Sequence, residues 1–124
     1  MTLLLVFIGG GLGSVARFAM MKAIGRVMGG DFPWHTLGVN LLGAVLIGAL
    51  TEFLALRVSG VEATRLLLVT GFLGGFTTFS AFSLEAALMW QRGDYWLLSA
   101  YVAASVIGTI AAVICGGAVA RVVL

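Results

Sequence analysis

The run Gly71–Glu85 (GFLGGFTTFSAFSLE) lies inside a hydrophobic segment that is long enough to cross a bilayer. Its middle consists of glycine and hydroxyl residues, which do not favour a simple lipid-facing helix. Non-helical backbone at membrane depth is tolerated only where protein buries it or where it lines a water-filled cavity. The run therefore predicts an interrupted membrane helix and indicates an ion site or an ion pathway.

The composition is that of an integral membrane protein. Of the 124 residues, 61% are hydrophobic and only 10% are charged, whereas a soluble domain carries about 25% charged residues. Mean hydropathy is +1.16. We expect an all-α chain of four membrane helices, with the third one broken, at about residues 3–24, 34–56, 62–90 and 95–120. They form one domain over residues 1–124, without a separate linker or tail.

The basic residues are evenly divided between the two membrane faces. Four spans put both termini on one side, and the Lys/Arg bias of short loops normally sets orientation. Arg17 lies within the first span and is left out of the count. Three basic residues fall on each side: Arg57, Arg65 and Arg121 with the termini, and Lys22, Arg26 and Arg92 opposite. This balance predicts insertion in both orientations; alternatively, a factor outside this count sets one orientation.

Small residues recur at helical spacing. Gly9, Gly13 and Arg17 are four apart on the first expected helix, and Asn40, Ala44 and Gly48 repeat the pattern on the second. Such spacing lets helix backbones approach closely in lipid. Four helices packed this tightly leave little room for an internal channel. We therefore expect any ion pathway to need a second copy of the chain.

Hydroxyl and aromatic side chains share faces of the last two helices. Tyr101, Ser105 and Thr109 repeat every four residues, which predicts a polar track, although a single buried hydroxyl usually only bonds to a backbone carbonyl. Phe79 and Phe82 share a face of the third helix. They are either ordinary packing residues or rings whose electropositive edges face an anion.

Other polar residues lie near this face or deep within a span. Ser80 and Ser83 offer hydroxyl donors close to the two rings. Asn40 offers an amide at a depth where polar groups are costly and suggest function, or it only bonds across helices. Arg17 either snorkels to the interface or lines an aqueous vestibule that attracts anions.

No pattern in the sequence indicates an enzyme. His35 is a lone histidine beside a loop, and the sequence has no Cys/His/carboxylate cluster with metal-site spacing. No nucleophile has an evident base. Glu85, near the end of the third segment, either ends the polar run or lies at the water boundary.

The chain resembles the Fluc (CrcB) family of fluoride channels over essentially its whole length. The glycine-rich start that ends in Ser14–Phe18 (SVARF) is similar to the family's first helix, and Thr36–Asn40 (TLGVN) matches its second-helix signature. The strongest match is Gly71–Ser83, because the pattern G-G-x-T-T-F-S-x-F-S is rare elsewhere.

The resemblance implies an antiparallel, dual-topology homodimer in the inner (plasma) membrane, with two separate fluoride pores. Such a channel lets cytoplasmic fluoride leave passively and protects the cell from its toxicity. The resemblance also implies a break in the third helix at the Gly/Thr region. There the main-chain carbonyls of Gly74 and Thr77 from both subunits would hold a central structural sodium ion (Na+).

The resemblance also assigns roles to the polar and aromatic residues. It implies that Phe79 and Phe82 are the pore phenylalanines, that Asn40 donates to fluoride, and that Arg17 lies near the aqueous vestibule. The polar track would comprise Ser80 with the face of Tyr101, Ser105 and Thr109. Family members often have threonine where this chain has Ala81, from which we expect altered conduction but not its loss.

Two other classes of protein compete with a channel. A small multidrug transporter is also a short four-helix protein prone to dual topology, but that class relies on a glutamate in its first helix, where this chain has Arg17 and no carboxylate. A non-conducting assembly subunit would account for the small-residue spacing. It would not account for the combination of asparagine, phenylalanine and hydroxyl residues.

Overall fold

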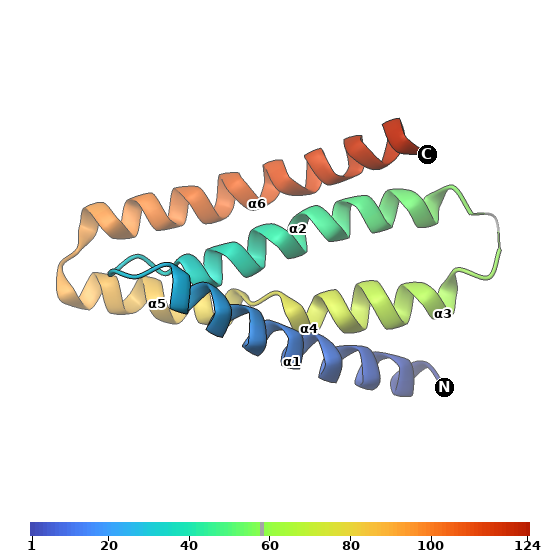
Figure 1. Cartoon of the computed structure of the whole chain (residues 1–124), viewed down its shortest axis with the longest axis horizontal. Coiled ribbons are helices and arrows are strands. Elements are labelled where there is room, and N and C mark those ends of the chain that lie inside the picture. The colour runs from blue at the N-terminus through green and yellow to red at the C-terminus, as the bar shows by residue number, and fades with distance from the viewer. Residues whose placement is uncertain (58) are drawn as a thin grey trace.

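A computed structural model describes residues 1–57 and 59–124, and its regular secondary structure is helical throughout these residues. The first, second and fourth spans are single helices: α1 (Thr2–Val27), α2 (Trp34–Ala55) and α6 (Tyr95–Val123). The third span is built from four shorter pieces that follow one another (Figure 1). They are α3 (Glu62–Thr64), η1 (Arg65–Leu73), α4 (Gly74–Phe76) and α5 (Phe79–Arg92).

The expected four-span, all-α fold with a broken third helix is confirmed. Four helical segments are long and apolar enough to cross a membrane, and the third of them covers Glu62–Arg92. Both termini lie at the same end of the bundle (Figure 1). The basic residues counted outside the spans therefore lie three at each end of the bundle, as the sequence predicts.

The third span differs from a regular α-helix over its first half. Residues Arg65–Leu73 form a π-helix, in which each turn is wider than in an α-helix. Nothing in the residue pattern predicts this wider winding. It brings Gly71 against Gly9 of α1, where a Cβ on either glycine would meet the other helix's backbone.

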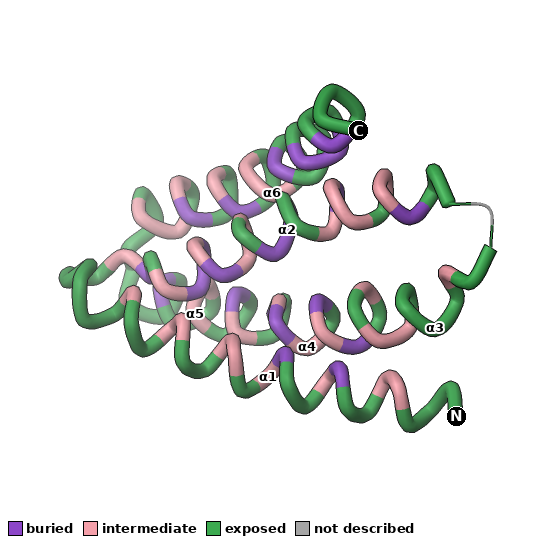
Figure 2. The backbone as a smooth tube through the Cα atoms, turned by 45° about the vertical axis from the view of Figure 1, so that its right-hand side comes forward, coloured by how far each residue is buried: buried purple, intermediate pink, exposed green. Residues whose placement is uncertain are grey.

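Glycines set how closely the helices approach. In α1 the buried residues are Gly9 and Gly13, and a Cβ at Gly13 would collide with the carbonyl of Phe72. On the other side of the bundle, a Cβ at Gly48 of α2 would collide with the carbonyl of Val113 in α6. Buried positions accordingly lie where these helices face each other, as Figure 2 shows. The small residues therefore act as the packing devices that their spacing predicts.

We expect Gly13→Ala to destabilise the protein, because the added methyl group meets backbone that has no rotamer with which to yield. Overpacking of this kind costs about 1–3 kcal/mol. Gly11→Ala is the matched control, since nothing lies within 4 Å of the Cβ it would add. The thermal midpoint of the purified protein in detergent should fall for Gly13→Ala and stay constant or rise for Gly11→Ala. Equal midpoints for the two variants would contradict close packing at Gly13.

Candidate ion site

The helix break lies at Thr77 and Thr78, whose backbones are extended (ψ 157° and φ −149°). The preceding residues Gly74–Phe76 remain helical, so the break is confined to the threonines rather than spread over the Gly/Thr region. The chain resumes as α5 with Thr78 as its N-cap, where Oγ1 accepts a hydrogen bond from the Ala81 amide at 3.2 Å. The two threonines thus end one helix and start the next at membrane depth.

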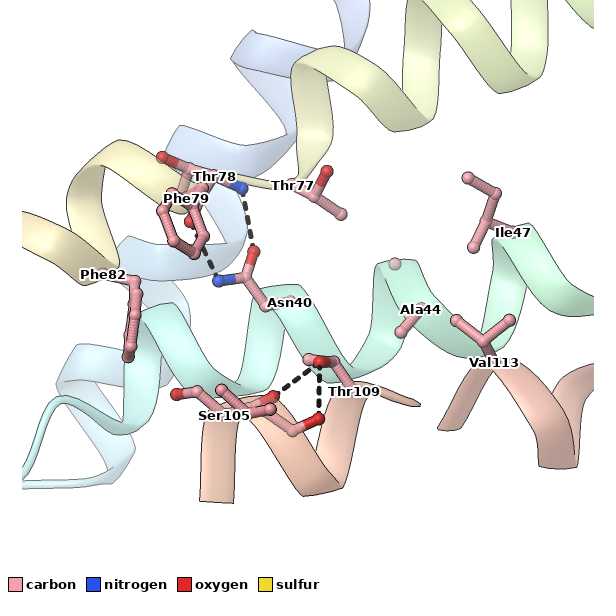
Figure 3. A pocket seen from close by; sticks show the side chains of 12 residues that line it. Asn40, Ala44, Ile47, Thr77, Thr78, Phe79, Phe82, Ser105, Thr109 and Val113 are labelled. Atoms are coloured by element: carbon pink, nitrogen blue, oxygen red, sulfur yellow. Dashed lines mark hydrogen bonds between the residues drawn. The ribbon is translucent and has the colours of Figure 1, made fainter. Parts of the chain in front are cut away.

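Asn40 of α2 holds this break from the side. Its Oδ1 accepts from the Thr78 amide at 2.8 Å, and its Nδ2 donates to the Thr78 carbonyl at 3.0 Å. Figure 3 shows both bonds between the one side chain and the one backbone residue. Asn40 therefore bonds across helices, where it supplies the partner of the Thr78 amide and a second bond to the N-cap carbonyl that begins α5. Because an amide nitrogen carries two hydrogens, one N–H of Asn40 is still free to donate.

An open groove of about 300 Å³ lies beside the break. Apolar residues of α2 and α6 form part of its lining. The predicted site residues that line it are Asn40, Thr77, Phe79, Phe82, Ser105 and Thr109. None of the described residues lining this groove is charged. The groove is therefore a neutral site that offers dipoles and ring edges.

The two phenylalanines differ sharply in burial. Their ring centroids are 5.4 Å apart with the planes inclined at 46°. Phe82 is 9% exposed and packs against Tyr101, whereas Phe79 is 77% exposed. Phe82 therefore combines a packing role with its place on the groove. Phe79 has no comparable packing within the described chain.

Ser105 supplies an uncommitted hydroxyl to the groove. Its Oγ is buried and has no hydrogen-bond partner among the described residues. The Thr109 hydroxyl, one turn further along α6, instead donates to the Ser105 carbonyl at 2.5 Å. A buried hydroxyl without a partner is costly and calls for a ligand or a water. Ser105 is therefore the hydroxyl best placed to donate to something bound in the groove.

The structure does not bring all the predicted hydroxyls to the groove. The Tyr101 hydroxyl donates to Glu85 Oε2 at 2.5 Å, away from Ser105 and Thr109. The Oγ of Ser80 lies 3.3 Å from the Oγ1 of Thr78. The Oγ of Ser83 donates to the Phe79 carbonyl of its own helix at 3.0 Å. Neither serine is among the residues that line the groove. The expected single track therefore falls into separate groups of hydroxyls.

Arg17 and Gly74 lie on the other side of the break. The guanidinium of Arg17 is half-buried, and its Nη1 is 3.4 Å from the Thr77 carbonyl oxygen. Gly74 is exposed. Arg17 thus points toward the break, at the carbonyl that the resemblance assigns to sodium. A carbonyl oxygen has two lone pairs, so this contact leaves room for a second electropositive partner.

Three polar residues of the site were not singled out from the sequence as site residues. Thr78 forms the centre of the break, Thr36 donates to Glu85 Oε1 at 2.6 Å, and Glu85 joins Thr36 to Tyr101. Thr36 lies four residues before Asn40, so helical periodicity places both on one face of α2. That spacing was a usable signal for Thr36.

A four-span helical bundle whose third helix is broken beside a neutral, donor-lined groove defines a small membrane protein of the ion-channel type. Residues 4–117 match the family model described as CrcB-like protein, Camphor Resistance (CrcB). The chain belongs to this family, a class of ion channels and not of enzymes.

Named relatives cover nearly the whole chain. It is 50% identical to the "Fluoride-specific ion channel FluC" of Rhizobium etli (strain CIAT 652), over 94% of each sequence. The protein of the same name from Chelativorans sp. (strain BNC1) is 48% identical over 98% of each. That from Rhodopseudomonas palustris (strain BisB5) is 44% identical over 99% of each.

We expect Asn40→Ala to lower stability, because it leaves the amide of Thr78 without a partner in a buried position and removes a second bond to the Thr78 carbonyl. Each unsatisfied group costs about 1–3 kcal/mol. Thr51→Ala, at an exposed polar position on the same helix, is the matched control. Thermal unfolding in detergent should show a clear fall for Asn40→Ala only. An unchanged midpoint would mean that the break does not depend on this side chain.

Proposed function

We propose that this chain is a fluoride-selective ion channel of the inner (plasma) membrane, through which cytoplasmic fluoride leaves the cell. The observation that carries the proposal is the neutral groove, where an exposed phenylalanine and an unpaired serine hydroxyl lie beside a broken helix. The relatives that cover nearly the whole chain are named as fluoride-specific channels, which supports the same ion.

The groove suits a small, strongly hydrated anion. Such an ion gives up water only if several donors replace it at once. The free N–H of Asn40 and the hydroxyl of Ser105 are two such donors, and the edges of the Phe79 and Phe82 rings are electropositive. Since none of these groups carries a full charge, the ion is held weakly enough to leave again.

The direction of flow follows from the membrane potential. Fluoride enters a cell as neutral HF and ionises in the cytoplasm. An inside-negative potential then favours exit of the anion by about 2.3 kcal/mol per charge per 100 mV. A passive pore is therefore sufficient to protect the cell from fluoride toxicity.

The functional unit in this proposal is a homodimer with two pores. Phe79 is 77% exposed and Gly74 is exposed, although both lie in the middle of a membrane span. Thr77, whose backbone is irregular, is only half-buried in the single chain, and irregular backbone cannot face lipid at that depth, so a second copy would cover this side of the break. The same second copy would close the open side of each groove.

We infer that the two copies are antiparallel. The basic residues are balanced between the two ends of the bundle. Trp34, Trp90 and Trp96 all lie at helix ends opposite the termini (Figure 1). An antiparallel pair therefore places tryptophan anchors at both membrane interfaces, where aromatic residues are favoured. A parallel pair would crowd all of them into one interface.

The break also fits a structural sodium ion between the copies. A helix that ends at Phe76 leaves its last carbonyls without intrahelical donors, and the partial negative charge of a helix C-terminus favours a cation. The carbonyls of Gly74 and Thr77 from both subunits would hold the ion. Its charge would stabilise the facing helix ends, which form the central contact of the dimer.

We expect Phe79→Ile to impair fluoride flux without loss of stability, because the ring is exposed in the subunit yet lines the groove. The measurement is anion efflux from liposomes that contain the purified protein, followed with fluoride and chloride electrodes. The wild-type protein should release fluoride rapidly and chloride negligibly. Phe79→Ile should slow fluoride release by at least tenfold.

Phe7→Ile provides the matched control for this substitution. Phe7 is 78% exposed on α1, almost the same as Phe79, but it does not line the groove. Its variant should conduct like the wild type. Equal permeation of fluoride and chloride, or no permeation of either, would overturn the channel assignment. A fluoride flux in Phe79→Ile equal to that of the wild type would contradict a role of the Phe79 ring in conduction.

Sodium should be needed to keep the channel active. After prolonged dialysis against potassium or N-methylglucamine salts, fluoride efflux should fall several-fold, and sodium added back should restore it. The reason is that opposed carbonyl groups without a cation repel each other. Efflux that stays constant through the same dialysis would count against a sodium ion at Gly74 and Thr77.

A further inference from the structure

A second, polar cavity lies at the end of the bundle opposite the termini. It measures about 440 Å³ and is bounded by the residues between α1 and α2 and by one face of α5. Its charged and titratable lining residues are Asp31, His35, Glu85 and Arg92. Glu85 lies one helical turn beyond Phe82, so this cavity begins close to where the neutral groove ends.

Glu85 is the centre of a hydrogen-bonded cluster at the inner end of this cavity. Its Oε1 accepts from the Thr36 hydroxyl at 2.6 Å and lies 3.3 Å from His35 Nε2. Its Oε2 accepts from the Tyr101 hydroxyl at 2.5 Å. The Glu85 carboxylate therefore accepts hydrogen bonds from both Thr36 and Tyr101, whose hydroxyls lie between the groove and the cavity. Its negative charge would also repel an anion that approaches from Phe82.

We propose that His35 is a positioning residue of the ion pathway that makes fluoride conduction depend on pH. The inference rests on the proposed fluoride channel. Histidine gains a positive charge between about pH 8 and pH 5. When protonated, His35 draws the Glu85 carboxylate into an ion pair and neutralises its charge. The neutralised pair then repels a passing fluoride ion less than the lone carboxylate does.

Among the described residues that line the cavity, His35 is the one of a type that changes charge near neutral pH. It is the only histidine of the sequence, and its side chain is 37% exposed, so protons reach it from water. Arg92 is paired with Asp94 at 3.2 Å. Gly25 of α1 and Met28, which follows α1, also line the cavity and have no titratable side chain.

The other charged or titratable groups around the cluster come from three parts of the chain. Asp31 comes from the residues between α1 and α2, Glu85 and Arg92 from α5, and Tyr101 from α6. Carboxyl, guanidinium and phenol groups ordinarily titrate below or above the interval from about pH 5 to 8. A pH response in this interval is therefore assigned to His35.

The test is fluoride efflux from liposomes at pH values from 6 to 8, with the same pH on both sides so that orientation does not matter. Leakage of HF from protein-free liposomes is subtracted at each pH. Wild-type efflux should rise at least threefold from pH 8 to pH 6. His35→Gln should show low efflux with no pH dependence. His35→Arg, which is charged throughout, should show high efflux at every pH.

Two further variants separate a pH effect on Glu85 from a structural role of the cavity. Glu85→Gln should conduct without pH dependence, because the charge that His35 neutralises is gone. Arg92→Gln, which changes another lining residue, should keep the wild-type pH response. The thermal midpoints should match that of the wild type for the His35 variants, since the side chain is half-exposed in the first turn of α2.

The outcomes distinguish this inference from the proposed function. Fluoride efflux with the same pH dependence in wild type and His35→Gln would overturn the role of His35 and leave the channel intact. A wild-type profile that is flat from pH 6 to 8 would do the same. Absence of fluoride efflux at every pH would overturn the channel, and the role of His35 with it.

Discussion

The pair of hydrogen bonds between Asn40 and the backbone of Thr78 is the interaction on which the rest of the site depends. A membrane offers no water to satisfy an amide that leaves the helical ladder. Asn40 supplies one acceptor and one donor from α2, which is itself held against α6 by the backbone contact at Gly48. The helix can therefore stop at Phe76 and resume at Phe79. That interruption sets where α5 begins, and with it the positions of Phe79 and Phe82. The lining of the groove therefore depends on the small-residue packing that holds α2 in place.

Much of this architecture could be predicted from the sequence, because it follows from apolar length and from residues that a lipid-facing helix avoids. The spans and the broken third helix are of this kind. The position of the break is not, because it depends on a tertiary contact. Gly75 stays helical where it packs against the carbonyl of Gly10, and the backbone opens only at Thr77 and Thr78, where Asn40 pairs with Thr78. The π-helical winding before the break likewise follows no local pattern.

The site shows the same division. Helical periodicity correctly places Tyr101, Ser105 and Thr109 along one face of α6, and Ser105 and Thr109 both line the groove. Helical periodicity determines the face on which a Cβ atom lies, but it does not determine where the hydroxyl of that side chain points. The tyrosine ring carries its hydroxyl away from Ser105 to Glu85, whereas the short threonine hydroxyl turns back to its own helix. Only the three-dimensional structure therefore shows that Ser105 is the hydroxyl left without a partner.

The arrangement of charge along the bundle bears on how a pore could bind and still release an anion. The groove beside the break holds no charged side chain among its described lining residues, while the next cavity holds a carboxylate one turn beyond Phe82. Conduction requires a site that is favourable to enter and weak enough to leave. Neutral donors meet the first requirement by replacing water, because several of them line the same groove. The carboxylate beyond the aromatic pair opposes the second, since its charge repels an anion that leaves Phe82, and the proposed protonation of His35 would offset that charge. Thr36 and Tyr101 donate hydrogen bonds to this carboxylate and so offset part of the free-energy cost of burying its charge.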